Sequence, residues 1–112
     1  MKRIEATINL FKLDEVKEVL NEIGIQGMTV TKVEGFGKQE SHIEFYRASK
    51  NDVDFIPKVR LEVIAENGLV EKVVKTIQEK AKIDEIGEGK IFVSNLDQVI
   101  RIRTGETGET AI

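Results

Sequence analysis

Residues 3–10, RIEATINL, alternate polar and apolar side chains along their whole length. A period of two places every second side chain on the same face, so this stretch predicts a strand with one buried face. Immediately after it, the apolar spacing changes to that of a helix. The residues that share the apolar face of this helix are Val16, Val19, Leu20 and Ile23. Asp14 is expected to cap the start of the helix, and Gly24 is expected to end it.

The rest of the chain continues with further strands and a second helix. Residues 28–33 and 59–63 are rich in β-branched and alternating apolar residues, which predicts a second and a third strand. A second helical face follows, made of Val70, Val73, Val74, Ile77 and Ala81. Residues 91–93 predict a fourth strand, and residues 99–103 predict a short fifth one. The order βαββαβ predicts a single α+β domain over residues 1–112, a ferredoxin-like sandwich.

The connection between the second and third strands, about residues 37–57, is the most unusual part of the chain. It is polar, and it is far longer than a hairpin loop of about two to five residues. Loops of this length in compact domains usually carry a function. We therefore expect this loop to be exposed and to have a functional role.

The composition excludes several classes of protein. No apolar run reaches the roughly 20 residues of a membrane-spanning helix, and the N-terminus lacks the continuous apolar core of a signal peptide. The chain has no cysteine and one histidine, so disulfides, thiolate metal sites and three-histidine zinc sites are ruled out within one chain. This composition is typical of the cytoplasm. The net charge of −3 gives no general attraction for nucleic acid.

Three short segments have the residue types that bind anions. Gly35–Gln39 and Gly87–Lys90 combine glycines, whose backbone permits close approach to a ligand, with one lysine each. Arg101 and Arg103 lie two residues apart, so a strand would present both guanidinium groups on one face, and such groups suit phosphate oxygens. The alternative interpretation is a pair of solvated turns and a charged strand face. Neither glycine segment matches a Walker A or a dinucleotide-binding motif.

The whole chain resembles the PII signal-transduction proteins. The segments that carry the resemblance are Gly27–Thr31, Gly35–Gln39, Val53–Val59, Ile86–Val93 and Val99–Glu106. The resemblance implies a compact homotrimer of ferredoxin-like subunits, with a site in each cleft between neighbours for which ATP and ADP compete. The nucleotide-site residues that the resemblance implies are Gly27, Met28, Thr29, Gly37, Lys38, Glu62, Ile64, Gly87, Glu88, Gly89, Lys90, Arg101 and Arg103.

The resemblance also implies a second effector, 2-oxoglutarate, which joins Mg-ATP at the base of the long loop. Gln39 would contact both 2-oxoglutarate and Mg²⁺, Lys58 would pair with a carboxylate, and Gly87 would complete the site. The residues near this site that depart from the family's common pattern are Glu40, Ser41 and Glu85. Glu40 brings a negative charge close to a dianion, which is expected to weaken 2-oxoglutarate binding by repulsion.

The tip of the loop implies a partner protein. Arg47 matches the arginine that relatives insert into ammonium channels, and we expect partner contacts at Tyr46 and Arg47. The partner would be a membrane transporter, such as an ammonium channel, or a cytosolic enzyme. Asn51 stands where many relatives have the tyrosine that is uridylylated, so that modification is ruled out, whereas the phosphorylatable Ser49 is retained.

The function that the resemblance implies is a non-catalytic sensor of the ATP/ADP ratio, gated by 2-oxoglutarate, that reports through the loop. Two alternatives stay open on the sequence. One is a slow nucleotide hydrolase or phosphotransferase that uses the same cleft, although no general base or acceptor site is evident beside it. The other is an RNA-binding module of the same fold, which the acidic balance and the lack of aromatic residues on the strands disfavour.

Overall fold

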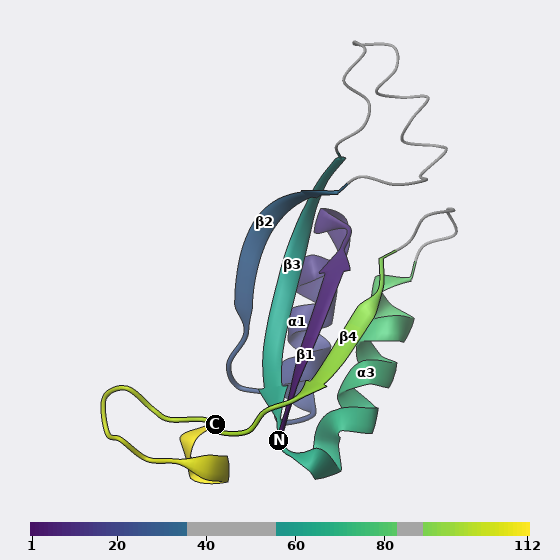
Figure 1. Ribbon diagram of the computed structural model, residues 1–112. Helices are drawn as coiled ribbons and strands as arrows, with labels where there is room; N and C mark the ends of the chain where they lie inside the picture. The colour runs from purple at the N-terminus through teal and green to yellow at the C-terminus, as the bar shows by residue number, and fades with distance from the viewer. Residues whose placement is uncertain (36–55, 83–88) are drawn as a thin grey trace, which may run out of the picture.

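The computed structural model describes residues 1–35, 56–82 and 89–112. The strands β1 (Lys2–Ile8), β2 (Thr29–Gly35), β3 (Ile56–Ala65) and β4 (Ile91–Asn95) form an antiparallel sheet in the order β2-β3-β1-β4. The helices α1 (Leu13–Glu22) and α3 (Asn67–Ala81) cover one face of this sheet (Figure 1). Short 3₁₀ turns, η1 (Leu10–Lys12) and η2 (Gly108–Ala111), complete the described elements. The predicted βαββαβ order of a ferredoxin-like α+β fold is confirmed.

The core lies between the sheet and the two helices. The alternation of β1 and β3 directs one set of side chains into it: Ile4, Ala6, Ile8, Val59, Leu61, Val63 and Ala65. The helices close it from the other side with Val16, Leu20, Val73 and Ile77. The remaining side chains of these strands lie on a helix-free face, which consists of Arg3, Glu5, Thr7, Lys58, Arg60, Glu62 and Ile64 together with Thr29 of β2. The candidate site uses this face.

The two ends of the sheet differ in what they carry. At one end, which we call the loop end, β1 and β2 finish while β3 and β4 begin, so the long loop joins the sheet there. At the other end, β1 and β2 begin while β3 and β4 finish. Figure 1 places both chain termini at this second end, which we call the terminal end. None of the helices in the described ranges is long and apolar enough to cross a membrane.

The start of α1 differs from the prediction. The helix begins at Leu13 after η1, and its N-cap residue, Lys12, makes no side-chain cap hydrogen bond. Asn9 caps η1 instead, by accepting a hydrogen bond from the backbone N–H of Phe11 at 2.9 Å. Because η1 runs directly into α1, Asp14 lies inside the first turn of the helix. An acidic residue there still interacts favourably with the helix dipole.

The fifth strand predicted for residues 99–103 is not formed in the described chain. This segment turns back on itself, so it pairs with the following residues instead of with the sheet: Ile100 forms an isolated bridge with Thr107. The backbone N–H of Arg101 donates to the carbonyl of Glu106 at 2.9 Å, and the N–H of Gly108 donates to the carbonyl of Val99 at 3.1 Å. The result is a short C-terminal hairpin, residues 99–108. Arg101 and Arg103 therefore lie in and beside a turn rather than on one strand face.

Gly24→Ala is expected to reduce the free energy of unfolding by about 1 kcal/mol, because Gly24 ends α1 with a φ of +107°, which only glycine adopts without strain. A Cβ there would meet nothing within 4 Å, so the cost comes from the backbone alone. Gly68→Ala is the matched control, since it also has open space but no positive φ. Urea unfolding should show Gly68→Ala equal to or above wild type; equal losses in both variants would contradict this account.

Candidate functional site

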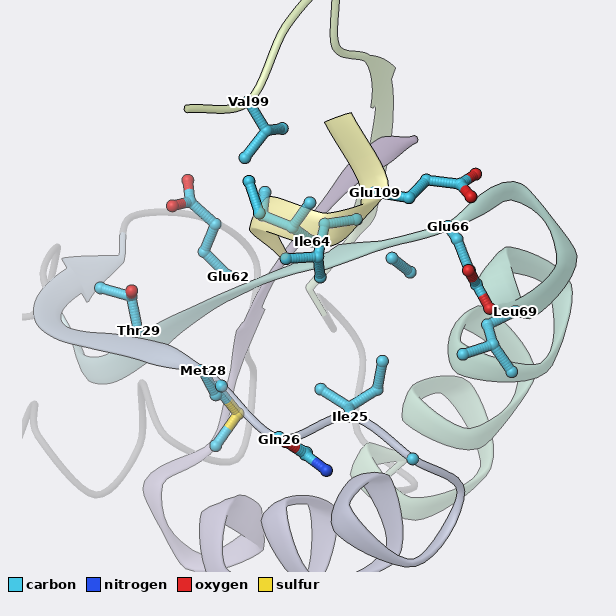
Figure 2. Close-up of a pocket in the computed structure, with 15 residues that line it drawn as sticks. Ile25, Gln26, Met28, Thr29, Glu62, Ile64, Glu66, Leu69, Val99 and Glu109 are labelled. Carbon is cyan, nitrogen blue, oxygen red and sulfur yellow. The ribbon is translucent and has the colours of Figure 1, made fainter. Parts of the chain in front are cut away.

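A pocket of about 460 Å³ lies at the terminal end of the sheet (Figure 2). We call it the terminal pocket. The start of β2 and the end of β3 form its floor, because Thr29 is paired directly with Glu62 and Ile64 lies one position further along the same face. Its rim comes from the 24–28 segment and from the C-terminal residues after the hairpin. Strand register thus brings together residues that are more than thirty positions apart in the chain.

The terminal pocket is apolar with acidic groups at its edge. The apolar side chains that line it include Ile25, Met28, Ile64, Leu69 and Val99. The carboxylates are those of Glu62, Glu66 and Glu109, and none of the described residues that line the pocket is basic. Such a lining suits a flat, mostly apolar group that carries hydrogen-bond donors, and it disfavours phosphate.

A second pocket, of about 280 Å³, lies at the loop end between the end of α3 and the junction of β1 with β4. We call it the loop-end pocket. Its lining includes Thr7, Gln78, Lys82, Gly89 and Lys90, and none of the described residues that line it is acidic. The two pockets therefore have opposite charge. An anionic group suits the loop-end pocket, and a donor-bearing apolar group suits the terminal pocket.

Gly89 has a structural reason for being glycine. A Cβ at this position would overlap the carbonyl oxygen of Thr7 and would lie 3.2 Å from its carbonyl carbon. The backbone that leads into β4 thus passes directly against the end of β1. This close approach sets the position of the neighbouring Lys90 at the edge of the loop-end pocket.

Lys58 and Arg101 lie outside both pockets. Lys58 is on the helix-free face near the loop end, and it is only 5% exposed. Arg101 is held within the C-terminal hairpin: its guanidinium lies 3.8 Å from the carboxylate of Glu106 and donates to the backbone oxygen of Ile112 at 3.4 Å. Arg103 is exposed in the turn. Neither arginine reaches the loop-end pocket of its own subunit.

Comparison with known proteins agrees with this architecture. A family model described as nitrogen regulatory protein P-II matches residues 1–106. The chain belongs to the P-II family. Proteins named nitrogen regulatory protein P-II from Azospirillum brasilense and Rhizobium meliloti are 55% and 56% identical to it over 112 residues, which is 100% of each chain. The crystal structure of Arabidopsis thaliana PII bound to citrate is similar with a TM-score of 0.81 and 39% sequence identity, covering 99% of this chain and 91% of that chain.

The structure divides the residues that the P-II resemblance implied for the nucleotide. Those that line the terminal pocket are Gly27, Met28, Thr29, Glu62 and Ile64. Those that line the loop-end pocket are Gly89 and Lys90. Those that lie outside the described residues are Gly37, Lys38, Gly87 and Glu88, and the same holds for Gln39, Tyr46, Arg47, Ser49 and Asn51. The residues of the terminal pocket and those of the loop-end pocket thus lie at opposite ends of the sheet of one subunit.

Sequence reasoning missed part of the terminal pocket. Glu109, Ala111 and Ile112 come from the C-terminal segment, to which the sequence alone assigns no role. The apolar pair Ala111-Ile112 at the end of a polar tail is the one signal that pointed to a contact. The sequence alone also assigns no role to Leu69. Helical periodicity shows which face of a helix is buried, but it does not show which turn of that helix borders a pocket.

Proposed function

We propose that this P-II protein is a cytoplasmic homotrimer that senses ATP and ADP, takes 2-oxoglutarate with Mg-ATP as a second effector, and regulates a transporter or a metabolic enzyme through residues 37–57. The observation that carries this proposal is the opposite charge of the two pockets. A nucleotide has the same division, since its base and ribose carry donors on a flat body while its phosphates are anionic. The terminal pocket suits the base and ribose, and the loop-end pocket suits the phosphates.

The positions of the two pockets support a site shared between subunits. Gly89 is level with Ile8 and Val59 in the sheet, so Ile64 lies five residues further along β3. This corresponds to about 17 Å along the strands, with roughly 10 Å more across them. This distance joins the far sides of the two pockets and is comparable to the length of a fully extended nucleotide, so a ligand would have to be stretched out to fill both pockets of one subunit. The loop end of one subunit placed against the terminal end of the next would join the two halves, with Arg101 and Arg103 close to the phosphates.

The 2-oxoglutarate part of the proposal has two supports. Lys58 is almost fully buried, and burial of an ammonium group favours pairing with an anion such as a carboxylate. The Arabidopsis PII relative was crystallised with citrate, which is a carboxylate anion. In the proposed site, Lys58 pairs with the carboxylate of 2-oxoglutarate, while Gln39 contacts Mg²⁺ and the effector beside Gly87.

Nucleotide sensing is tested by calorimetry with ATP, ADP and Mg-ATP, with and without 2-oxoglutarate. Wild type is expected to bind ATP and ADP, and 2-oxoglutarate is expected to tighten Mg-ATP binding in wild type but not in Gln39→Ala. Absence of ATP and ADP binding would refute the sensor. Unchanged Mg-ATP affinity in the presence of 2-oxoglutarate would leave an energy sensor without the second effector.

The shared site is tested with two variants that each damage one half. Glu62→Ala and Lys90→Ala are both expected to weaken ATP binding, Lys90→Ala by about tenfold or more because a charge-assisted contact to phosphate is lost. Lys72→Ala, an exposed lysine of α3 outside both pockets, is the control and should bind as wild type. Co-assembly of the Glu62→Ala and Lys90→Ala chains should restore wild-type sites. A mixed assembly without any restored site would place the whole site within one subunit.

A further inference from the structure

Two glutamates face each other on the helix-free face. Glu5 of β1 is directly opposite Glu62 of β3 in the register of the sheet. Like charges at directly opposed positions of neighbouring strands repel and destabilise the pair. Glu62 lines the terminal pocket, whereas Glu5 does not. The pocket carboxylate therefore has a second negative charge beside it, and its orientation depends on what offsets that charge.

Arg3 offsets it. One nitrogen of the Arg3 guanidinium lies 3.4 Å from Oε2 of Glu62, and another lies 4.0 Å from Oε1 of Glu5. Arg3 is two residues before Glu5 on the same face and is paired with Ile64 across the strands. Its planar, forked group lies between the two carboxylates and meets both. Arg3 itself does not line the terminal pocket.

The contact is to one oxygen of Glu62. A carboxylate has two oxygens that accept hydrogen bonds, and none of the described residues forms an ion pair with Oε1 of Glu62, so this oxygen can accept from a ligand while Oε2 faces Arg3. Loss of Arg3 would leave Glu62 opposed to Glu5 without a cation between them. The carboxylate would then turn away from Glu5, and its free oxygen would no longer be held at the floor of the pocket.

We propose that Arg3 is a positioning residue for Glu62, and that the pair selects a ligand that brings an N–H or O–H donor to the floor of the terminal pocket. This inference rests on the proposed function, in which the donor belongs to the adenine or ribose of a nucleotide. Arg3 acts through Glu62 and makes no contact with the ligand. The side chains of Arg3 and Glu62 are 46% and 35% exposed, so solvent weakens the ion pair and the effect on affinity is moderate.

A double-mutant cycle measures this coupling. Arg3→Gln is expected to weaken ATP binding by about threefold to fivefold in the wild-type background and to have no effect in Glu62→Gln, because Arg3 then has no carboxylate to position. Arg3→Lys retains the charge and should stay within about twofold of wild type. Arg60→Gln is the matched control: it removes an equal charge from the same face, and Arg60 lines neither pocket. It should bind ATP as wild type.

Ligand analogues give a readout that a purely structural role would not change. The loss caused by Arg3→Gln should disappear with either inosine triphosphate, which lacks the exocyclic amine of adenine, or 2′-deoxyATP, which lacks one ribose hydroxyl. The analogue that erases it identifies the donor that Glu62 accepts. An equal loss with all three ligands, or an equal loss in the Glu62→Gln background, would overturn the role of Arg3. Failure of wild type to bind ATP would instead refute the proposed function.

Discussion

Gly89→Ala is expected to lower the free energy of unfolding by about 3 kcal/mol. The new Cβ would overlap the carbonyl oxygen of Thr7, a backbone atom of β1 that cannot rotate away as a side chain does. The segment that leads into β4 must therefore move, and Lys90 must move with it. If the loop-end pocket binds phosphate, ATP affinity falls in the same variant. Guanidinium unfolding at a constant protein concentration measures the first effect, and calorimetry measures the second.

Gly27→Ala is the control for this prediction. Gly27 also belongs to the candidate site, in the terminal pocket, but a Cβ there would meet nothing within 4 Å. The unfolding free energy of the Gly27→Ala variant should equal that of wild type. A Gly89→Ala protein that unfolds at the same denaturant concentration as Gly27→Ala would show that the close approach to Thr7 does not exist in solution.

Leu61→Ala is expected to cost about 3 kcal/mol of stability, because it leaves a cavity in the middle of the core. Leu61 is fully buried on β3, paired with Ala6 of β1 on one side and Val30 of β2 on the other. The helices pack over this position, so the surrounding side chains have little freedom to collapse into the space. Denaturant unfolding followed by circular dichroism measures the loss.

Ile102→Ala removes about the same apolar volume as Leu61→Ala, but at a fully exposed position instead of a fully buried one. Ile102 is completely exposed at the turn of the C-terminal hairpin, so its replacement should change the stability of an isolated subunit by less than about 0.5 kcal/mol. A loss equal to that of Leu61→Ala would contradict this expectation. It would show instead that a second copy of the chain covers the hairpin tip.

In the proposed function, the division of the site between two ends of the sheet is the reason why the protein needs more than one copy of its chain. The chain carries an acidic, apolar pocket at one end of its sheet and a basic pocket at the other, and we propose that a nucleotide binds to both where two subunits meet. The long loop joins the sheet at the loop end, beside the basic pocket. In the proposed function, phosphate contacts there would favour one arrangement of the loop, which a partner then recognises.

Local periodicity predicted most of the fold. The alternation in residues 3–10 predicted β1, and the helical spacing from Val70 to Ala81 predicted α3, because each element buries one face and the spacing of the apolar residues shows which face that is. The two errors have local causes. The turn η1, which Asn9 caps, leads directly into α1, so Asp14 lies inside the helix and not at its cap. The turn after Arg101 makes residues 99–103 pair with the chain that follows them. A short apolar alternation does not specify which strand it will pair with.

By itself, the sequence determined the type and order of the elements, the likeness to P-II proteins and the residues that carry it. The type and order of the elements depend on residues that are neighbours within a few positions. The likeness to P-II proteins depends on motifs that are continuous in the sequence. Only the tertiary structure decided that Glu62 lies opposite Glu5 and beside Arg3, that Gly89 passes against Thr7, and that two pockets of opposite charge lie at opposite ends of the sheet. Those facts depend on strand register and packing between distant segments, which are set by the burial of the whole core and not by any one stretch of the chain.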